Sequence, residues 1–361
     1  MRIVVDINHP GHVHYFKCFI WEMQKKGHEV LVTASEKDIT FRLLENYHLQ
    51  FENIGSYGTS LVSKLANIPV IDIRYYRLMK SFKPDILVGF GSIRAAHVSF
   101  LLRKPCINFE DTEHSTEQIS LYLPFVTAVC TPSCFTQDLG KKQIRFNGYM
   151  ELASLHPNRF TPNPAVLTEI GLAEGDPFII VRFVSWQASH DVGQHGIRDK
   201  IGLVKVLEQY GRVLITSEGA VPAELQEYQI RVSPEKLHDL LYYATLYVGE
   251  GGTTASEAAV LGTHAIHIST TAKYCGIFSD LNQYGLLWTS ESDEETIQKA
   301  IELLQDPDLK IVGQHKRDHL IDQKIDVTAF MIWFIESYPE SLELMKQNPD
   351  FQEKFKSGGP L

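Results

Sequence analysis

The sequence predicts an α/β protein with two doubly wound, Rossmann-like domains. Its 361 residues suffice for two domains of about 150 residues each. Short β-branched runs alternate with amphipathic stretches, which is typical of parallel sheets covered by helices. The alternation occurs twice, on either side of the proline-containing segment 151–165. We expect an N-terminal domain at 1–150, a linker at 151–165, a C-terminal domain at 166–324 and a helical tract at 325–361.

The first half of the chain begins with a βαβ unit. An apolar run at 2–6 is followed by an amphipathic stretch at 13–26, which ends at Gly27, and by a β-branched run at 29–33. Strand, helix and strand at this spacing predict a parallel sheet. Further strands are expected at 51–54, 85–89, 106–109 and 128–130, with helices at 36–47, 61–82, 92–102 and 116–123.

The second half has the same architecture without repeating the sequence. Strands are expected at 177–183, 213–216, 246–248, 265–268 and 286–289. The apolar spacing from Ile325 to Met345 predicts a long helix. Two doubly wound domains leave a cleft between them, and ligands of such sheets bind beyond the carboxyl ends of the strands. We therefore expect the catalytic and ligand-binding residues in the loops that follow the strands.

Composition and charge exclude several classes of function. No run reaches the roughly 20 apolar residues that span a bilayer, and the N-terminus has no signal-peptide pattern, so we predict a cytoplasmic protein. Five cysteines without a CxxC pair favour neither disulfides nor a zinc site. The net charge of -10 argues against nucleic acid as a partner. Residues 1–150 carry 17 basic and 14 acidic side chains, so this half is expected to meet an anionic partner.

The most informative stretch is VGEGGTTASEAAVLGTHAIHI, which runs from Val248 to Ile268. A strand ends in glycines, and a helix with early hydroxyl groups follows. Helix N-terminal N–H groups beside glycines form a binding site for phosphate. The alternative is a tight turn with a Thr N-cap and Glu257 as the acid of a capping box.

With Ser233-Pro234-Glu235 before it, this stretch resembles the nucleotide-sugar site of GT-B glycosyltransferases. Peptidoglycan N-acetylglucosaminyltransferase and the UDP-N-acetylglucosamine 2-epimerases are the enzymes it resembles, and the whole chain looks like an uncharacterised prokaryotic family grouped with them. The resemblance implies a GT-B fold with an acceptor-binding first domain, a donor-binding second domain and a last helix that crosses back to the first. It implies diphosphate contacts from Gly251, Gly252, Thr253 and Thr254, a ribose contact from Glu257, and base contacts from the backbone around Arg231 and Val232.

A second constellation is the NHPGHVH loop at 8–14. Its Gly11-His12-Val13 resembles the GHV of the peptidoglycan transferase, although HPGH stands where that enzyme has a glycine cluster. A helix N-terminus disfavours the cationic form of His12, which suits a general base for the acceptor hydroxyl. His14 is expected to contact the acceptor. The alternative is that these histidines only cap a helix and pack a cleft wall.

A third constellation is FEDTEH at 109–114, after a predicted strand. This density of carboxylates indicates acid–base work or acceptor binding. Resemblance to the epimerases puts Glu110 near their catalytic glutamate; we expect catalytic roles for Glu110 and Asp111 and an acceptor contact from Glu113. A solvated first helical turn is the alternative. Ser92 stands where an epimerase aspartate would lie, which favours a transferase.

Two further segments have weaker signals. In the loop after the strand at 177–183, the resemblance implies donor contacts from Arg182 and Ser185, and Trp186 could stack on a sugar ring or belong to the core. The basic stretch 61–83 is interpreted as an ordinary amphipathic helix, with docking of a lipid-linked acceptor or an anionic membrane as the alternative. We expect no metal site, because Asp306-Pro307-Asp308 fits a helix stop better than a DxD motif.

Together these features predict a metal-independent, inverting glycosyltransferase that uses a nucleoside-diphosphate sugar, a UDP-sugar by resemblance. Its acceptor would be a glycan or a lipid-linked sugar in surface polysaccharide or glycan synthesis. No cofactor is expected, and peripheral membrane association is an alternative to a purely cytoplasmic location. Two other functions stay open: a nucleotide-sugar 2-epimerase or hydrolase on the same fold, and a non-catalytic subunit that binds a nucleotide-sugar.

Overall fold

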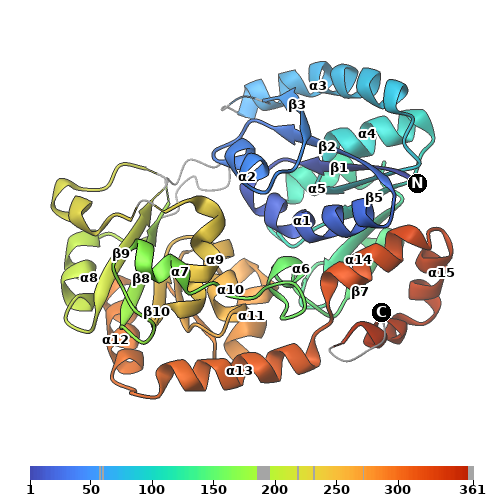
Figure 1. The fold of residues 1–361 in the computed structure, drawn as a ribbon. Helices are drawn as coiled ribbons and strands as arrows, with labels where there is room; N and C mark the ends of the chain where they lie inside the picture. Colours follow the sequence, from blue (N-terminus) through green and yellow to red (C-terminus); the bar gives the residue numbers. More distant parts are fainter. Residues whose placement is uncertain are drawn as a thin grey trace. The chain divides into compact units, whose positions relative to one another are not determined.

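The computed structural model describes residues 1–56, 58, 61–184, 196–217, 219–230, 232–270 and 272–356, with the backbone alone for 61–65. The chain forms two compact units. Unit 1 comprises Met1–Arg159 and Gln323–Leu361, and unit 2 comprises Phe160–Asp322. Both are layers of helices on an all-parallel sheet, so the predicted α/β fold of GT-B type is confirmed (Figure 1).

Unit 1 contains a seven-stranded sheet in the order β3-β2-β1-β4-β5-β6-β7. Each strand predicted for this half is present, with ends that differ by one or two residues. The last strand was not predicted, because its sequence QIRF alternates polar with apolar residues at the edge of the sheet. The strands are β1 (Arg2–Ile7), β2 (Glu29–Ser35), β3 (Phe51–Gly55), β4 (Ile86–Phe90), β5 (Cys106–Phe109), β6 (Ala128–Pro132) and β7 (Gln143–Phe146).

Helices cover both faces of this sheet. On one face α1 packs against α6 and α14 (Figure 1). There Phe16 of α1 meets Phe109 of β5, and Phe330 of α14 stacks on Phe146 of β7. On the other face α4 packs between α3 and α5 over a core that includes Val4, Leu87 and other strand residues. The helices are α1 (Pro10–Lys25), α2 (Thr40–Asn46), α3 (Leu61–Phe82), α4 (Ile93–Leu102), α5 (Thr116–Tyr122), α6 (Leu152–Leu155), α14 (Val327–Glu336) and α15 (Glu340–Gln347).

Two segments of unit 1 differ from their predicted form. The segment 151–165 contains α6, whose four residues are buried against α1, so part of the expected linker is core. The long helix expected from Ile325 to Met345 is divided into α14 and α15. Pro339 stands at this break, and proline disfavours helical backbone in the residue before it. The most apolar helix, α14, has 10 residues, and no helix among the described residues is long and apolar enough to span a bilayer.

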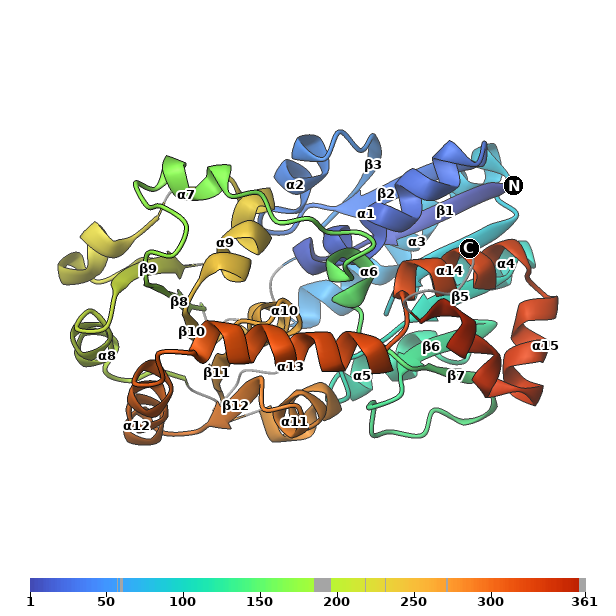
Figure 2. The same cartoon turned by 60° about the horizontal axis from the view of Figure 1, so that its bottom comes forward.

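Unit 2 contains a five-stranded sheet in the order β12-β11-β10-β8-β9. All five predicted strands are present. In Figure 2, α12 lies next to α8, whereas α10 packs against α9 and α11. The strands are β8 (Phe178–Phe183), β9 (Arg212–Ser217), β10 (Leu246–Gly249), β11 (Ala265–Ile268) and β12 (Leu287–Ser290). The helices are α7 (Ala165–Glu169), α8 (Lys200–Leu207), α9 (Leu237–Tyr243), α10 (Gly252–Val260), α11 (Gly276–Gln283), α12 (Asp293–Leu304) and α13 (Leu309–Gln323).

Candidate functional site

The glycine-rich turn of unit 2 follows β10, the central strand of its sheet. Gly249 ends the strand, Gly251 is the N-cap of α10, and the helix begins at Gly252. No side chain caps this helix, so the Thr N-cap and capping box considered from the sequence are not formed. The described residues also provide no hydrogen bond to the N–H groups of Gly252, Thr253 or Thr254. These three donors therefore remain available to an anion at the carboxyl end of the sheet.

Two of these glycines are needed for close packing. A Cβ added to Gly251 would lie 3.0 Å from Nε of Arg182, and one added to Gly252 would lie 2.9 Å from Cζ of Phe278. The Arg182 side chain therefore runs along the turn at Gly251. This arrangement places the guanidinium stem of a predicted donor residue beside the predicted phosphate-binding turn.

Glu257 lies in α10 and is nearly buried, with 4% of its surface exposed. Its Oε1 is 3.0 Å from Nε2 of His238, a buried residue of α9. The ring of Phe160 meets His238 edge-on, at 6.3 Å between centroids. This imidazole was not singled out from the sequence, because its partner lies 19 positions further along the chain and on another helix. The contact places an imidazole nitrogen against one carboxylate oxygen of the residue predicted to bind ribose.

The other predicted donor contacts are located only in part. Val232 is half-buried in the segment before α9. Arg182 is half-buried at the end of β8. Ser185, Trp186 and Arg231 lie outside the described residues.

In unit 1 a buried charged network lies at the end of β1. Asp6 and Arg94 are fully buried and form an ion pair, with Nη2 of the arginine 2.7 Å from Oδ1 of the aspartate. Thr33 and Ser92 each donate a hydroxyl hydrogen bond of 2.6 Å to the Asp6 carboxylate. Asn8 donates to the same carboxylate at 3.0 Å. The network thus joins β1, β2 and α4 to the loop that precedes α1.

His12 lies in the first turn of α1 and is nearly buried. Burial, with smaller effects from nearby cationic groups, holds the pKa of His12 well below its ordinary value, so the imidazole is neutral. Its Nδ1 accepts a hydrogen bond of 3.3 Å from the backbone N–H of Asn8. A neutral ring that accepts at Nδ1 carries its proton on Nε2. The neighbouring His9 caps α1 by accepting from the N–H of Gly11, as the capping alternative predicted for this loop.

The three predicted carboxylates follow β5 and have different surroundings. Glu110 is buried, and its two oxygens accept hydrogen bonds from the Thr112 N–H at 3.1 Å and the Tyr122 hydroxyl at 3.0 Å. Burial raises the pKa of Glu110 to about 8. Glu113 is also buried and accepts from the N–H of Thr136 at 3.2 Å. Asp111 is the half-buried member of the three, so it is the one that keeps access to solvent.

Tyr15 of α1 lies beside both His12 and Asp111. Its ring stacks on His12 at 6.3 Å between centroids, and its side chain acts to lower the pKa of Asp111. Burial, followed by repulsion from the Glu151 carboxylate, raises the pKa of Asp111 to about 8. Phe90 lies 4.6 Å from the His12 ring and completes an aromatic wall. No local sequence pattern marks Tyr15 or Glu151, although both lie beside predicted elements.

His14 does not join this group. Its Nδ1 lies 3.3 Å from the Tyr47 hydroxyl, which also accepts a hydrogen bond of 3.2 Å from Lys17. Tyr47 follows α2, so His14 faces that helix end, whereas His12 faces Phe90. The structure therefore brings together His12, Asp111 and Glu110 but separates His14 from them.

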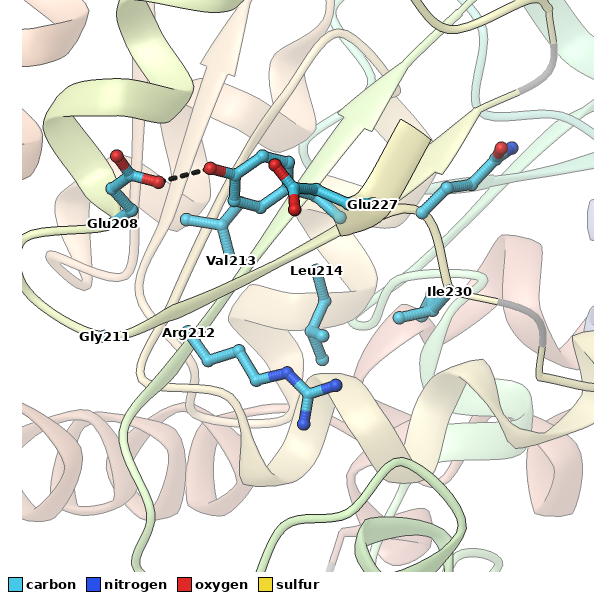
Figure 3. A pocket seen from close by; sticks show the side chains of 9 residues that line it. Glu208, Gly211, Arg212, Val213, Leu214, Glu227 and Ile230 are labelled. Carbon is cyan, nitrogen blue, oxygen red and sulfur yellow. Dashed lines mark hydrogen bonds between the residues drawn. The ribbon is translucent and has the colours of Figure 1, made fainter. Parts of the chain in front are cut away.

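A surface pocket of about 360 Å³ lies elsewhere in unit 2, along the edge strand β9 (Figure 3). Its polar side chains are largely engaged, since Tyr228 donates to Glu208 and Arg212 donates to the Ile170 carbonyl at 2.6 Å. The pocket is lined by the start of β9 and lies away from the carboxyl ends of the strands. Across the described ranges, no group of three or more His, Cys, Asp or Glu side chains could hold a metal ion.

Comparisons with known proteins agree with this fold. A family model described as "Protein of unknown function (DUF354)" matches residues 1–331. An uncharacterized protein of Methanocaldococcus jannaschii is 26% identical over 278 residues, 73% of this chain and 80% of the relative. The UDP-GlcNAc 2-epimerase of the same organism, in complex with UDP-GlcNAc and UDP, is similar in structure with a TM-score of 0.61, 13% identity and coverage of 89% of this chain and 99% of the other. The structure of the spinosyn rhamnosyltransferase SpnG, complexed with spinosyn aglycone, is similar with a TM-score of 0.60 and 16% sequence identity. This similarity covers 92% of this chain and 99% of the SpnG chain.

Proposed function

The chain belongs to the DUF354 family, and we propose that it is a metal-independent, inverting glycosyltransferase that uses a UDP-sugar. In this proposal unit 2 binds the donor and unit 1 binds the acceptor, a glycan or lipid-linked sugar of polysaccharide or glycan synthesis. The observation that carries it is the uncapped start of α10 beside Arg182, with Glu257 further along the same helix. Proteins of this fold bind UDP-GlcNAc and UDP, which supports the donor class.

The leaving group can be stabilised without a metal ion. Transfer breaks the bond between the anomeric carbon and the diphosphate, which leaves with an extra negative charge. The N–H groups of Gly252, Thr253 and Thr254 are fixed donors at the positive end of a helix dipole, and the Arg182 guanidinium lies beside them. These groups stabilise the charge that develops on the diphosphate.

The surroundings of the three candidate bases in unit 1 support one assignment. Both carboxylate oxygens of Glu110 accept hydrogen bonds from other residues of the protein. The Nδ1 of His12 accepts a hydrogen bond from the Asn8 N–H, so its proton is on Nε2 and this nitrogen cannot act as a base. Asp111 is half-buried and has a raised pKa, as a general base requires. We assign proton removal from the acceptor hydroxyl to Asp111, and to His12 a hydrogen bond donated to the acceptor.

A thermal-shift titration tests the donor site. UDP bound only by the folded protein should raise the melting temperature, whereas GDP and CMP should raise it less. Glu257→Ala should weaken UDP binding about tenfold, because a hydrogen bond to ribose from a charged group contributes about 1.5–3 kcal/mol. Glu302→Ala, which alters an exposed acid of α12, is the matched control and should retain affinity. A wild-type protein that is not stabilised by any nucleotide would contradict the proposed function.

Product analysis separates transfer from the alternatives. A transferase consumes UDP-sugar only with an acceptor, whereas an epimerase or hydrolase consumes or converts it alone. A subunit that only binds nucleotide-sugar would do neither with any acceptor tested. We expect release of UDP that depends on the acceptor.

A surface of unit 1 supports an acceptor held at a membrane. Val70 and Ile73 on α3 and Phe100 and Leu101 on α4 are each more than half exposed. Asp72 and His97, hydrogen-bonded at 2.7 Å, join these two helices. Exposed basic side chains flank the apolar ones, and such a combination is typical of binding to anionic lipid surfaces. The basic residues are Arg74, Arg77, Lys80, Arg103 and Lys104.

Vesicle co-sedimentation tests this surface. The protein should bind vesicles that contain phosphatidylglycerol more strongly than vesicles of phosphatidylcholine alone, and added salt should weaken the binding. Phe100→Glu should reduce the bound fraction several-fold, since it removes an exposed apolar group and adds a like charge near the lipid. Ile311→Glu in α13, an exposed apolar residue of unit 2, should leave it unchanged. Equal loss in both variants would show that the apolar surface of α3 and α4 has no special role.

A further inference from the structure

His267 lies beside the glycine-rich turn, near the carboxyl end of β11. It is the neighbour of Gly249 in the sheet, and 3% of its surface is exposed. A Cβ added to Gly252 would lie 3.4 Å from Nε2 of His267 and 2.9 Å from Cζ of Phe278. Because Cβ and N of a residue are bonded to the same Cα, Nε2 is at most about 6 Å from the Gly252 nitrogen. The imidazole edge is thus next to the first of the three unused N–H groups of α10.

The position of the proton on this imidazole follows from its hydrogen bond. Nδ1 lies 3.3 Å from the carbonyl oxygen of Gly249. A carbonyl oxygen only accepts, so Nδ1 carries the proton and donates it. Burial lowers the pKa of His267 to about 4, so the ring is neutral at physiological pH. Nε2 then has a lone pair, and none of the residues that the structure describes forms a hydrogen bond with it.

The two sides of the glycine-rich turn therefore differ in chemistry. At Gly251 the Arg182 side chain provides a cation, and the start of α10 provides N–H donors, and both suit a phosphate. At Gly252 the neutral His267 provides an acceptor. Ionised phosphate oxygens have no hydrogen to donate to this acceptor, whereas a hydroxyl group has one. Nε2 is suited to a hydroxyl group that lies next to a bound phosphate.

We propose that Nε2 of His267 accepts a hydrogen bond from a hydroxyl group of the transferred sugar, the one that the UDP diphosphate carries. The inference rests on the proposed function for the identity of the donor. Glu257, which that function assigns to the ribose, lies more than one helical turn beyond Gly252. The group next to Gly252 is therefore assigned to the other end of the diphosphate. In this role His267 contributes to the binding of the sugar and not of UDP, and it disfavours a sugar that lacks the hydroxyl.

His267→Asn is the decisive variant. Its NH₂ group can take the place of Nδ1 as the donor to the Gly249 carbonyl, while no atom replaces Nε2. Titration calorimetry without an acceptor gives the Kd for UDP and for UDP-glucose, UDP-galactose and UDP-N-acetylglucosamine. For the UDP-sugar that the wild-type protein binds most tightly, the variant should raise the Kd about two- to tenfold, the effect of losing one neutral hydrogen bond. The Kd for UDP should stay unchanged.

Monodeoxy analogues of that UDP-sugar test the same contact without any substitution. One analogue should bind the wild-type protein about two- to tenfold more weakly than the parent UDP-sugar. His267→Asn should bind this analogue and the parent equally, because both partners of the hydrogen bond are then removed together. The analogue also identifies the hydroxyl group, and the measurement on the wild-type protein stands should His267→Asn not fold.

Two further variants separate this contact from packing. His267→Gln can place an amide oxygen near the position of Nε2, so it should restore part of the affinity for the UDP-sugar. His264→Asn is the matched control. His264 is a nearly buried histidine that directly precedes β11, and its Nε2 lies 3.1 Å from Nζ of Lys316. Its substitution should change neither Kd.

The possible results distinguish the inference from the proposed function. If His267→Asn weakens UDP and the UDP-sugar equally, or neither of them, His267 does not bind the transferred sugar. The inference is also overturned if every monodeoxy analogue binds the wild-type protein as tightly as the parent. A wild-type protein that binds no nucleotide overturns the proposed function and the inference together, whereas a wild-type protein that binds UDP leaves the inference to be decided by the variants.

Discussion

Arg94→Met is expected to destabilise unit 1 by about 3–5 kcal/mol, the usual effect of breaking a buried ion pair. Asp6 would keep its hydrogen bonds from Thr33 and Ser92 but would be a fully buried carboxylate without its cation. Asp6→Asn should also be costly, since it leaves the buried Arg94 guanidinium without its counter-ion. Urea-dependent hydrogen exchange of the β1 and β4 amides measures the loss within unit 1, apart from unit 2.

The double variant Asp6→Asn/Arg94→Met is the control. It removes both charges and keeps an acceptor oxygen for Thr33, so it should be less destabilised than the sum of its single variants. Additive losses would mean that the two groups contribute separately, and that the pair is not what holds β1 to α4.

The elements of the fold were predictable because they depend on neighbours in the chain. The run RIVVD, the amphipathic stretch after it and Gly27 specify a βαβ unit locally, and the strand ends were within one or two residues. Pro339 itself indicates a break, whereas the apolar spacing on both sides of it predicts one continuous helix. The edge strand β7 could not be predicted, because its alternation of polar and apolar residues covers only four positions.

The candidate site was predictable only where a known pattern marked it. The glycine-rich turn resembles a known motif, so Gly251, Gly252 and Glu257 could be named. Glu250 stands inside that motif, but Val184 and Ile197, whose N–H groups donate hydrogen bonds to its carboxylate, are 66 and 53 positions away, and no local pattern indicates them.

The same holds for Asp6 and Arg94, which are 88 positions apart and meet only because β1 and β4 are neighbours in the sheet. Which carboxylate of the 110–113 loop stays open to solvent depends on the packing of Tyr122 and Thr136 around it. The tertiary fold, and not the sequence of the loop, determines which carboxylate is exposed to solvent.

Asp111→Asn is expected to lower kcat by about 10²- to 10⁴-fold, the usual contribution of a general base. The pH profile should distinguish a carboxylate base from His12. A carboxyl with a pKa of about 8 is protonated below that pH, so kcat/KM should rise about tenfold per pH unit up to pH 8 and then level off. His12, whose pKa lies well below its ordinary value, would be neutral throughout and give no such rise.

Glu151→Gln provides the matched control, because repulsion from Glu151 is the second cause of the raised pKa of Asp111. Removing that charge should move the rise of the profile to lower pH, while the plateau at high pH keeps most of the wild-type rate. A profile that is flat between pH 6 and 8 would exclude Asp111 as the base and return that role to His12. A rise that Glu151→Gln leaves in place would instead indicate Glu110, whose pKa is also about 8.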